Sequence, residues 1–120
     1  MDVQLNELLV EYVEEIQQIA DKNAQKCARD AAKVLKTTSP QSEGHTKYAG
    51  SWGVKADKDT HTFTTWNRKH WQLTHLLENG HEIFSHGVST GKRTRANRHI
   101  ENAAEQFSRE FVEKTEREIK

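Results

Sequence analysis

Residues 51–66 read Ser-Trp-Gly-Val-Lys-Ala-Asp-Lys-Asp-Thr-His-Thr-Phe-Thr-Thr-Trp, and this stretch decides the fold class. Trp52, Val54 and Ala56 alternate with polar or small residues, which is the pattern of a half-buried strand. Residues 57–60 favour a turn, and residues 61–66 are rich in the β-branched and aromatic residues that favour strands. The stretch therefore predicts an antiparallel β-hairpin.

The chain before the hairpin predicts one long helix. No glycine or proline interrupts residues 1–38, and Pro40 ends the helix because a proline keeps the preceding residue out of the α region. One helix face carries residues at three- and four-residue spacing: Leu5, Leu9, Tyr12, Ile16, Ile19, Asn23, Cys27, Ala31 and Val34. Such a helix measures about 50 Å, more than the ~30 Å width of a small domain. It must bend near residues 21–23 or overhang the body, and an overhanging apolar face needs a partner.

After the hairpin, Asn67 is a suitable N-cap for a short helix. Gly80 ends this helix at positive φ, so valine there should destabilise the protein while asparagine is tolerated. The buried face of the helix consists of Leu73, Leu76 and Leu77. We expect the turn at residues 78–81 to send the chain back toward the sheet and to a neighbouring subunit.

The remaining chain predicts a short strand, a loop and a helix. Ile83 and Phe84 form a candidate third strand, residues 89–96 predict a basic loop, and Asn97 caps the last helix. The apolar face of that helix consists of Ile100, Ala104, Phe107, Phe111 and Ile119.

Together these elements predict a single α+β domain over residues 1–120, with a long N-terminal helix, a small antiparallel sheet, a short middle helix and a C-terminal helix. We expect the core to lie between the hairpin residues Trp52, Phe63 or Trp66 and three residues of the long helix, Leu9, Tyr12 and Ile16.

The composition indicates a polar protein with a thin core. Hydrophobic residues make up 33% of the chain and charged residues 30%, and the mean hydropathy is −0.96. No apolar run approaches the ~18 residues of a membrane span, and the acidic start lacks the basic segment of a signal peptide, so we expect neither. The single cysteine, Cys27, excludes an intramolecular disulfide, and its place on the apolar helix face favours a core role.

The net charge of zero hides a segregation of charge. Residues 1–16 contain five acidic residues and no basic one, whereas residues 92–98 contain four cations and no acid: Lys92, Arg93, Arg95 and Arg98. Copies of such a chain can join head to tail. Two alternatives stay open, because the two surfaces can remain solvated or the cations can hold phosphates without reading sequence.

Other patterns match known sites poorly. Histidines at positions 70, 75, 81 and 86, together with Glu78, offer metal ligands, but their spacing is not that of a metalloprotease. Residues 87–92 have one residue too few between the glycines for a phosphate-binding loop. We expect no metal, no cofactor and no enzymatic activity. A metal-dependent hydrolase and a small nucleic-acid-binding protein that uses the basic loop are the alternatives.

Three strings in a fixed order are more specific than these patterns: residues 47–52, residues 66–81 and residues 99–105. They resemble the head–tail joining, neck or minor tail component family of long-tailed phages, the gene-product-ten-like family of lambdoid-type phages. The matching residues are Tyr48, Ser51, Trp52, Asn67, Leu73, Thr74, His75, Leu76, Leu77, Glu78, Gly80, His81, His99 and Ile100. The chain departs from the family at Arg98 and Asn102, where the family often has prolines.

The resemblance implies a structural protein of the virion, made in the bacterial cytoplasm. Such proteins form a ring, commonly sixfold, that joins the tail to the capsid and lets DNA pass without sequence recognition, and many stay monomeric until they meet their partner. The implied partners are further copies of the chain and adjacent neck, connector and tail proteins, with no membrane contact. Lys92, Arg93, Arg95 and Arg98 would face either the DNA or a neighbouring subunit.

Overall fold

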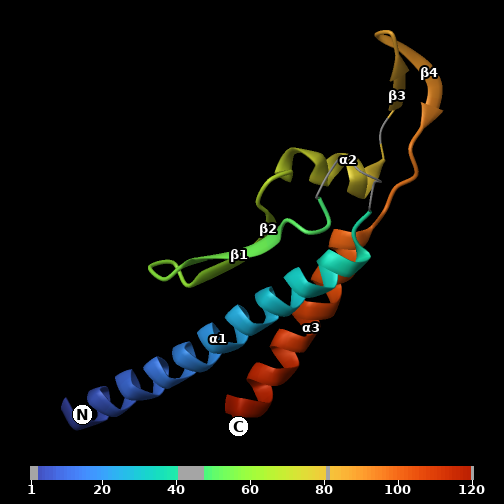
Figure 1. The fold of residues 1–120 in the computed structure, drawn as a ribbon. Helices are drawn as coiled ribbons and strands as arrows, with labels where there is room; N and C mark the ends of the chain where they lie inside the picture. The colour runs from blue at the N-terminus through green and yellow to red at the C-terminus, as the bar shows by residue number, and fades with distance from the viewer. Residues whose placement is uncertain (1–2, 41–47, 81, 120) are drawn as a thin grey trace.

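The computed structural model describes residues 3–40, 48–80 and 82–119 (Figure 1). In chain order its elements are α1 (Val3–Thr38), β1 (Trp52–Asp57), β2 (Thr62–Asn67), the 3-10 helix η1 (Trp71–Leu73), α2 (Thr74–Asn79), β3 (Glu82–Ser85), β4 (Val88–Arg93) and α3 (His99–Ile119). This order confirms the predicted α+β fold class and the end of the first helix near Pro40. None of the described helices is both long and apolar enough to cross a membrane.

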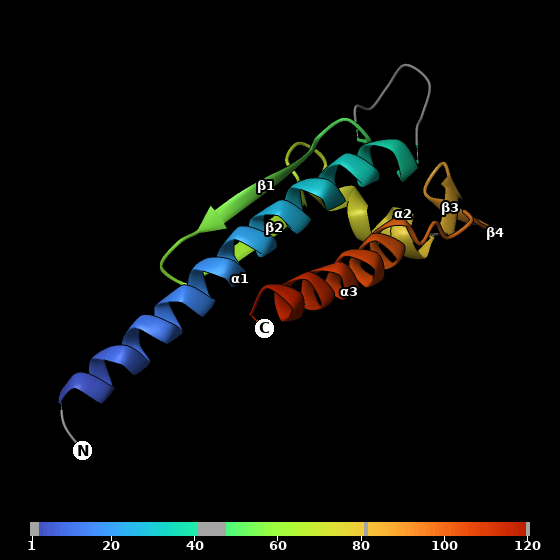
Figure 2. The ribbon, with the colours of Figure 1, turned by 90° about the horizontal axis from the view of Figure 1, so that it is seen from below.

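The core lies along the second half of α1. The β1–β2 hairpin covers one side of this half and α3 packs along another (Figures 1 and 2). Ala28, Ala31 and Ala32 are at most 9% exposed, and their small side chains let both neighbours approach closely. The core is completed by Leu35, Tyr48, Trp52, Ala103 and Phe107.

The prediction that Leu9, Tyr12 and Ile16 form the core opposite the hairpin is wrong for Leu9 and Tyr12, whereas Ile16 is half-buried. Trp52 is buried as expected and Phe63 and Trp66 are half-buried, but Leu9 and Tyr12 are each 53% exposed. The physical reason is length. Each strand has six residues and spans about 20 Å, which matches only roughly thirteen residues of helix. Because Trp52 starts the hairpin beside the end of α1, the strands stop well short of the helix N-terminus.

The first half of α1 therefore overhangs the body, which was one of the two predicted outcomes. The molecule measures 74 × 25 × 24 Å and has a radius of gyration of 20.1 Å, whereas a compact chain of this length has about 14 Å. Residues 3–16, which we call the overhang, extend beyond both the hairpin and α3 in the two ribbon views (Figures 1 and 2).

β3 confirms the candidate third strand, but the loop predicted for residues 89–96 is wrong over its first half. Residues 88–93 form β4, which pairs with β3 in a separate two-stranded antiparallel sheet. His86 and Gly87 connect the two strands, and both have positive φ, 52° and 80°, as the tight turns of hairpins require. This second hairpin projects away from β1–β2 (Figure 1), so the expectation that the chain returns to the first sheet is also wrong.

Candidate assembly interface

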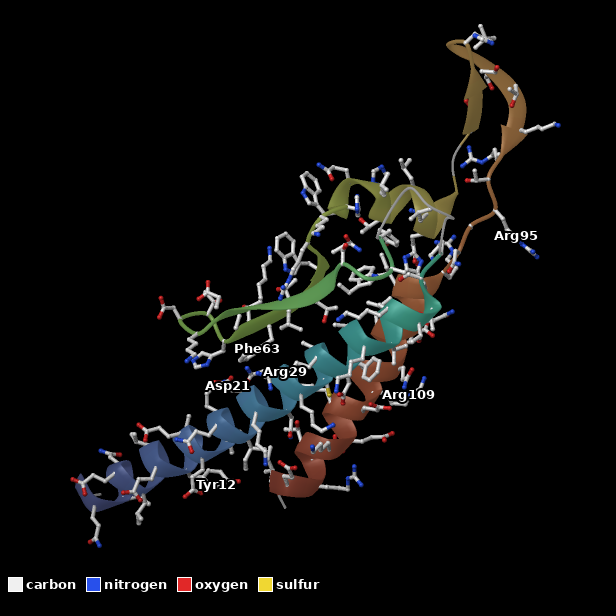
Figure 3. The ribbon with its side chains drawn as sticks, in the orientation of Figure 1. Tyr12, Asp21, Arg29, Phe63, Arg95 and Arg109 are labelled. Carbon is white, nitrogen blue, oxygen red and sulfur yellow. The ribbon has the colours of Figure 1, made fainter. Side chains whose placement is uncertain are left out.

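The overhang carries most of the exposed apolar side chains. Ten large hydrophobic residues are exposed in the described ranges, with exposed fractions from 36% to 68%, and six of them lie on the overhang: Leu5, Leu8, Leu9, Val10, Tyr12 and Val13. Figure 3 shows Tyr12 on the free part of α1, beyond the end of α3. A monomeric soluble protein rarely exposes a contiguous apolar patch, and such a patch indicates a docking surface.

The overhang also carries an acidic stripe. Glu7, Glu11, Glu14 and Glu15 are all exposed, and they recur at steps of four and three residues, which keeps them on one side of the helix. The first lysine or arginine of the chain is Lys22. The overhang thus presents two different sides, one apolar and one acidic, to any partner.

The second half of α1 carries a basic groove that the sequence analysis missed. Arg29, Lys33 and Lys36 recur at steps of four and three residues, and Arg68, which follows β2, completes the rim. The groove has a volume of about 450 Å³, and the described residues that line it are Arg29, Ala32, Lys33, Lys36, Trp52, Gly53, Val54 and Arg68. Four of these eight are cations and none is acidic. The helical spacing of the three cations on α1 is the available signal, but they are not consecutive in sequence, and Arg68 joins them only through folding.

Gly53 makes room for one wall of the basic groove. A Cβ atom built at this position would overlap the guanidinium of Arg68, so only glycine lets that group lie against β1. The floor of the groove is apolar, because Ala32 and Trp52 are buried and Val54 is half-buried. The groove therefore combines a cationic rim with an apolar floor.

The four cations predicted as one basic loop do not act as one group. The Arg93 guanidinium donates to the carbonyl of Gly80 at 3.4 Å. Arg98 donates to Oδ1 of Asn79 at 2.7 Å and lies 3.7 Å from a carboxylate oxygen of Glu101. These two arginines thus hold the end of α2 to β4 and α3. Lys92 and Arg95 are exposed, and Figure 3 shows Arg95 pointing away from the body.

Several of the motif residues meet in one buried network. The Tyr48 hydroxyl lies 2.8 Å from Nε2 of His99, and Nδ1 of His99 lies 2.7 Å from the carbonyl of Asn97. Because a carbonyl only accepts, Nδ1 donates to it. Trp52 packs edge-on against both rings, with centroids 5.6 and 6.2 Å away. Burial raises the pKa of Tyr48 to about 12, and the Glu78 carboxylate nearby adds to the shift.

Glu78 closes this network and caps α3. Its two carboxylate oxygens accept from the backbone amides of Ile100 at 2.8 Å and Glu101 at 3.1 Å. A negative charge at the N-terminus of a helix satisfies free amides and is favoured by the helix dipole. The prediction that Asn97 caps α3 is wrong, because the helix begins at His99 and the capping carboxylate comes from α2.

The position of Glu78 also matters for the alternative of a metal site built from His75, Glu78 and His81. His75 is exposed and Glu78 faces α3, while His81 lies outside the described residues. In the parts of the chain that the structure describes, no group of three or more His, Cys, Asp and Glu side chains could hold a metal ion.

The other motif residues also have structural positions. Asn67 is 1% exposed, and it donates to the carbonyl of Tyr48 at 2.7 Å and accepts from the amide of His70 at 2.9 Å. It therefore stabilises the turn before η1, although η1 and α2 begin later than an N-cap at Asn67 predicts. Leu73, Leu77 and Ile100 pack against the core, and Leu76 is half-buried. The carbonyl of Ser51 accepts from the amide of Arg68, and Thr74 donates to the carbonyl of Trp71.

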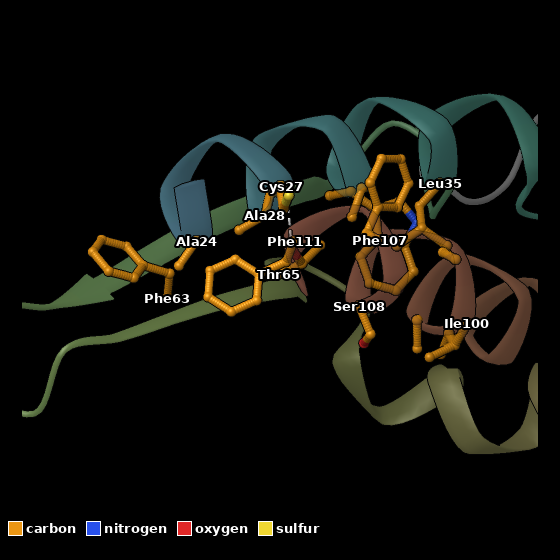
Figure 4. Close-up of a pocket in the computed structure, with 14 residues that line it drawn as sticks. Ala24, Cys27, Ala28, Leu35, Phe63, Thr65, Ile100, Phe107, Ser108 and Phe111 are labelled. Carbon is orange, nitrogen blue, oxygen red and sulfur yellow. Dashed lines mark hydrogen bonds between the residues drawn. The ribbon is translucent and has the colours of Figure 1, made fainter. Parts of the chain in front are cut away.

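An apolar pocket of about 390 Å³ lies between α1, the first hairpin and α3 (Figure 4). Phe63 comes from the hairpin, Phe107 and Phe111 from α3, and Cys27 from α1. Cys27 packs against the core, which confirms its predicted place, and burial raises the pKa of its thiol. A thiol of this kind is a weak nucleophile, because the thiolate is the reactive form.

We compared the chain with models of protein families, with curated proteins and with solved structures, and none of them matches it.

Proposed function

We propose that this chain is a structural subunit of the head–tail connection of a long-tailed phage, and that it joins further copies of itself through the overhang. The observation that carries the proposal is the overhang itself. Six exposed apolar side chains lie within residues 5–13, where the protein's own body does not cover them (Figure 2). An exposed apolar helix face of this kind marks a surface for a partner.

The motif residues support the same proposal in a different way. Tyr48, Trp52, Asn67, Glu78 and His99 are buried or nearly so, and they hold the loop before β1, the end of β2, α2 and the start of α3 together. Buried residues of this kind stabilise a fold. A resemblance at these positions therefore argues for a shared fold rather than for a shared catalytic site. In the proposed ring, the body of the protein would contact adjacent neck and tail proteins while DNA passes through the lumen.

The proposal is tested by electron microscopy of particles made without the protein. We expect separate capsids and tails in the absence of the chain and joined particles when the wild-type chain is supplied. A variant with Leu8→Gln and Val13→Gln should keep its fold, because both side chains are more than half exposed, yet it should fail to join capsids to tails.

Val112→Gln is the matched control, since Val112 is 51% exposed but lies on α3. This variant should join particles as the wild type does. Joined particles in the absence of the chain would exclude the proposed function. Normal joining by the Leu8→Gln, Val13→Gln variant would exclude the apolar side of the overhang as an assembly surface.

A further inference from the structure

We infer that the basic groove of one copy receives the acidic stripe of the overhang of the next copy. The two α1 helices would run in the same direction and cross at an angle, with a shift of 22 residues, or about 33 Å, along α1. The inference rests on the proposed self-assembly and adds to it the surface that receives the overhang.

The spacing of the charges carries the inference. Glu7, Glu11 and Glu14 are separated by four and then three residues, and Arg29, Lys33 and Lys36 are separated in the same order. A shift of 22 residues therefore sets each of the three acids beside one of the three cations. All six side chains are exposed, and both sets lie on one helix, so each copy carries both halves of the contact.

The order of the steps favours helices that run in the same direction. If the two helices ran in opposite directions, the spacing of the acids would be reversed to three and then four residues, while the spacing of the cations would stay four and then three. Glu11 would then lie out of register with Lys33. A shifted contact between helices that run in the same direction uses different surfaces on the two copies. Such a contact closes into a ring when the two helices cross at an angle, whereas strictly parallel helices would build an open filament. An antiparallel contact would instead give a closed dimer.

The apolar floor of the basic groove favours a helix over a nucleic acid as its occupant. Val10, which is 56% exposed, lies one turn from Glu7 and Glu14 on the overhang, and it would meet Val54 and Ala32 on the floor. A phosphate backbone would use the cationic rim but would leave this floor without an apolar partner. The net charge of zero also means that the acids and cations of the chain balance within a homo-oligomer.

Cysteine cross-linking of the purified protein tests the register. All variants carry Cys27→Ala, and circular dichroism checks that each one is folded. A Glu7→Cys copy is mixed with an Arg29→Cys copy under mild oxidation, and dimers are counted on a non-reducing gel. The matched control mixes Glu7→Cys with Lys36→Cys, which lies seven residues, about 10 Å, further along the groove. We expect the first pair to cross-link about tenfold faster, because Cα atoms more than ~7 Å apart do not form a disulfide.

Equal rates for the two pairs, or a faster reaction of the Lys36→Cys pair, would overturn the inference. The inference would also be overturned if the basic groove bound the phosphates of a nucleic acid instead of the overhang. In that case a random-sequence DNA duplex would bind with strong salt dependence, Arg29→Gln with Lys33→Gln would abolish the binding, and the first pair would not cross-link. If the cross-link fails while particles still need the chain, only this inference is lost. If it forms while particles assemble without the chain, only the proposed function is lost.

Discussion

Gly80 has φ 76° and ψ 164°, a combination that lies outside the left-handed helical region and is almost confined to glycine. The sequence predicts the positive φ correctly, but a ψ of 164° argues against the expectation that asparagine is tolerated there. Asparagine accepts the left-handed region, where ψ is near 50°. In addition, a Cβ atom at Gly80 would lie 2.6 Å from the carbonyl oxygen of Thr94.

We therefore predict that Gly80→Asn and Gly80→Val both lower the free energy of unfolding, by about 2 kcal/mol or more. Urea denaturation measures the loss. Gly91→Asn is the control, because Gly91 has nearly the same φ, 77°, and nothing lies within 4 Å of a Cβ atom built there. A Gly80→Asn protein that unfolds at the wild-type urea midpoint would refute the claim that Gly80 is required in this turn.

The cap on α3 gives a second prediction. Glu78→Ala should lower the free energy of unfolding by about 2 kcal/mol, because two backbone amides lose a charged acceptor. Glu78→Gln should cost less, since one amide keeps its oxygen. Glu105→Ala, an exposed position on α3, should stay within ~0.5 kcal/mol of the wild type. If Glu78→Ala and Glu105→Ala unfold alike, Glu78 does not stabilise α3.

The buried Tyr48 makes stability fall at alkaline pH. Its pKa rises from 10.0 to about 12 in the folded protein, so between these values the unfolded chain loses the phenolic proton while the native protein keeps it. The unfolded state then binds fewer protons, and the free energy of unfolding drops as pH rises, by about 2–3 kcal/mol above pH 12.

Unfolding curves between pH 9 and 12 measure this drop. The Tyr48→Phe variant should lack the Tyr48 contribution, whereas Tyr12→Phe, at a position that is 53% exposed, should keep it. An unchanged pH dependence in Tyr48→Phe would contradict the burial of the hydroxyl.

Among the helices and strands, sequence periodicity predicts those elements whose pattern repeats over neighbouring residues. α1 and the first hairpin are predicted well, because a four-and-three spacing and an alternation each repeat several times. β4 is not predicted, because its residues are exposed along their whole length and carry no alternation. Its signal is the His86-Gly87 turn, in which the non-glycine residue also has positive φ.

The candidate site shows the same limit. The exposed apolar face is predicted from the length of α1, but the basic groove is not, since Arg68 joins Arg29 and Lys33 only through folding. The capping of α3 by Glu78 from α2 is likewise a tertiary contact across 22 residues.

Deleting residues 1–16 tests whether the first half of α1 serves self-association while the second half stabilises the fold. The overhang contributes little burial, so we expect the free energy of unfolding to change by no more than about 1 kcal/mol, while self-association is lost. Leu35→Ala is the contrasting change, because Leu35 is 3% exposed in the core, and it should cost about 2–5 kcal/mol. Thermal and urea unfolding followed by circular dichroism give both values. A deletion that unfolds the body would show that the overhang is part of the core.

At the scale of the whole molecule, shape and charge point in the same direction. The molecule is 74 Å long and about 25 Å across, with the overhang of α1 at one end and the β3–β4 hairpin at the other (Figure 1). The acidic end of α1 matches the basic half of the same helix. The proposed self-assembly would cover the exposed apolar face of α1 and add burial to the small core.

The central claim is the proposed place of this chain at the head–tail junction of a long-tailed phage, and cryo-electron microscopy of junctions from particles assembled with this chain tests it most directly. The account predicts a closed ring of copies at the junction, in which residues 3–16 of each α1 lie beside the basic groove of a neighbour. A junction that lacks the chain, or a ring in which residues 3–16 project into solvent, would contradict it.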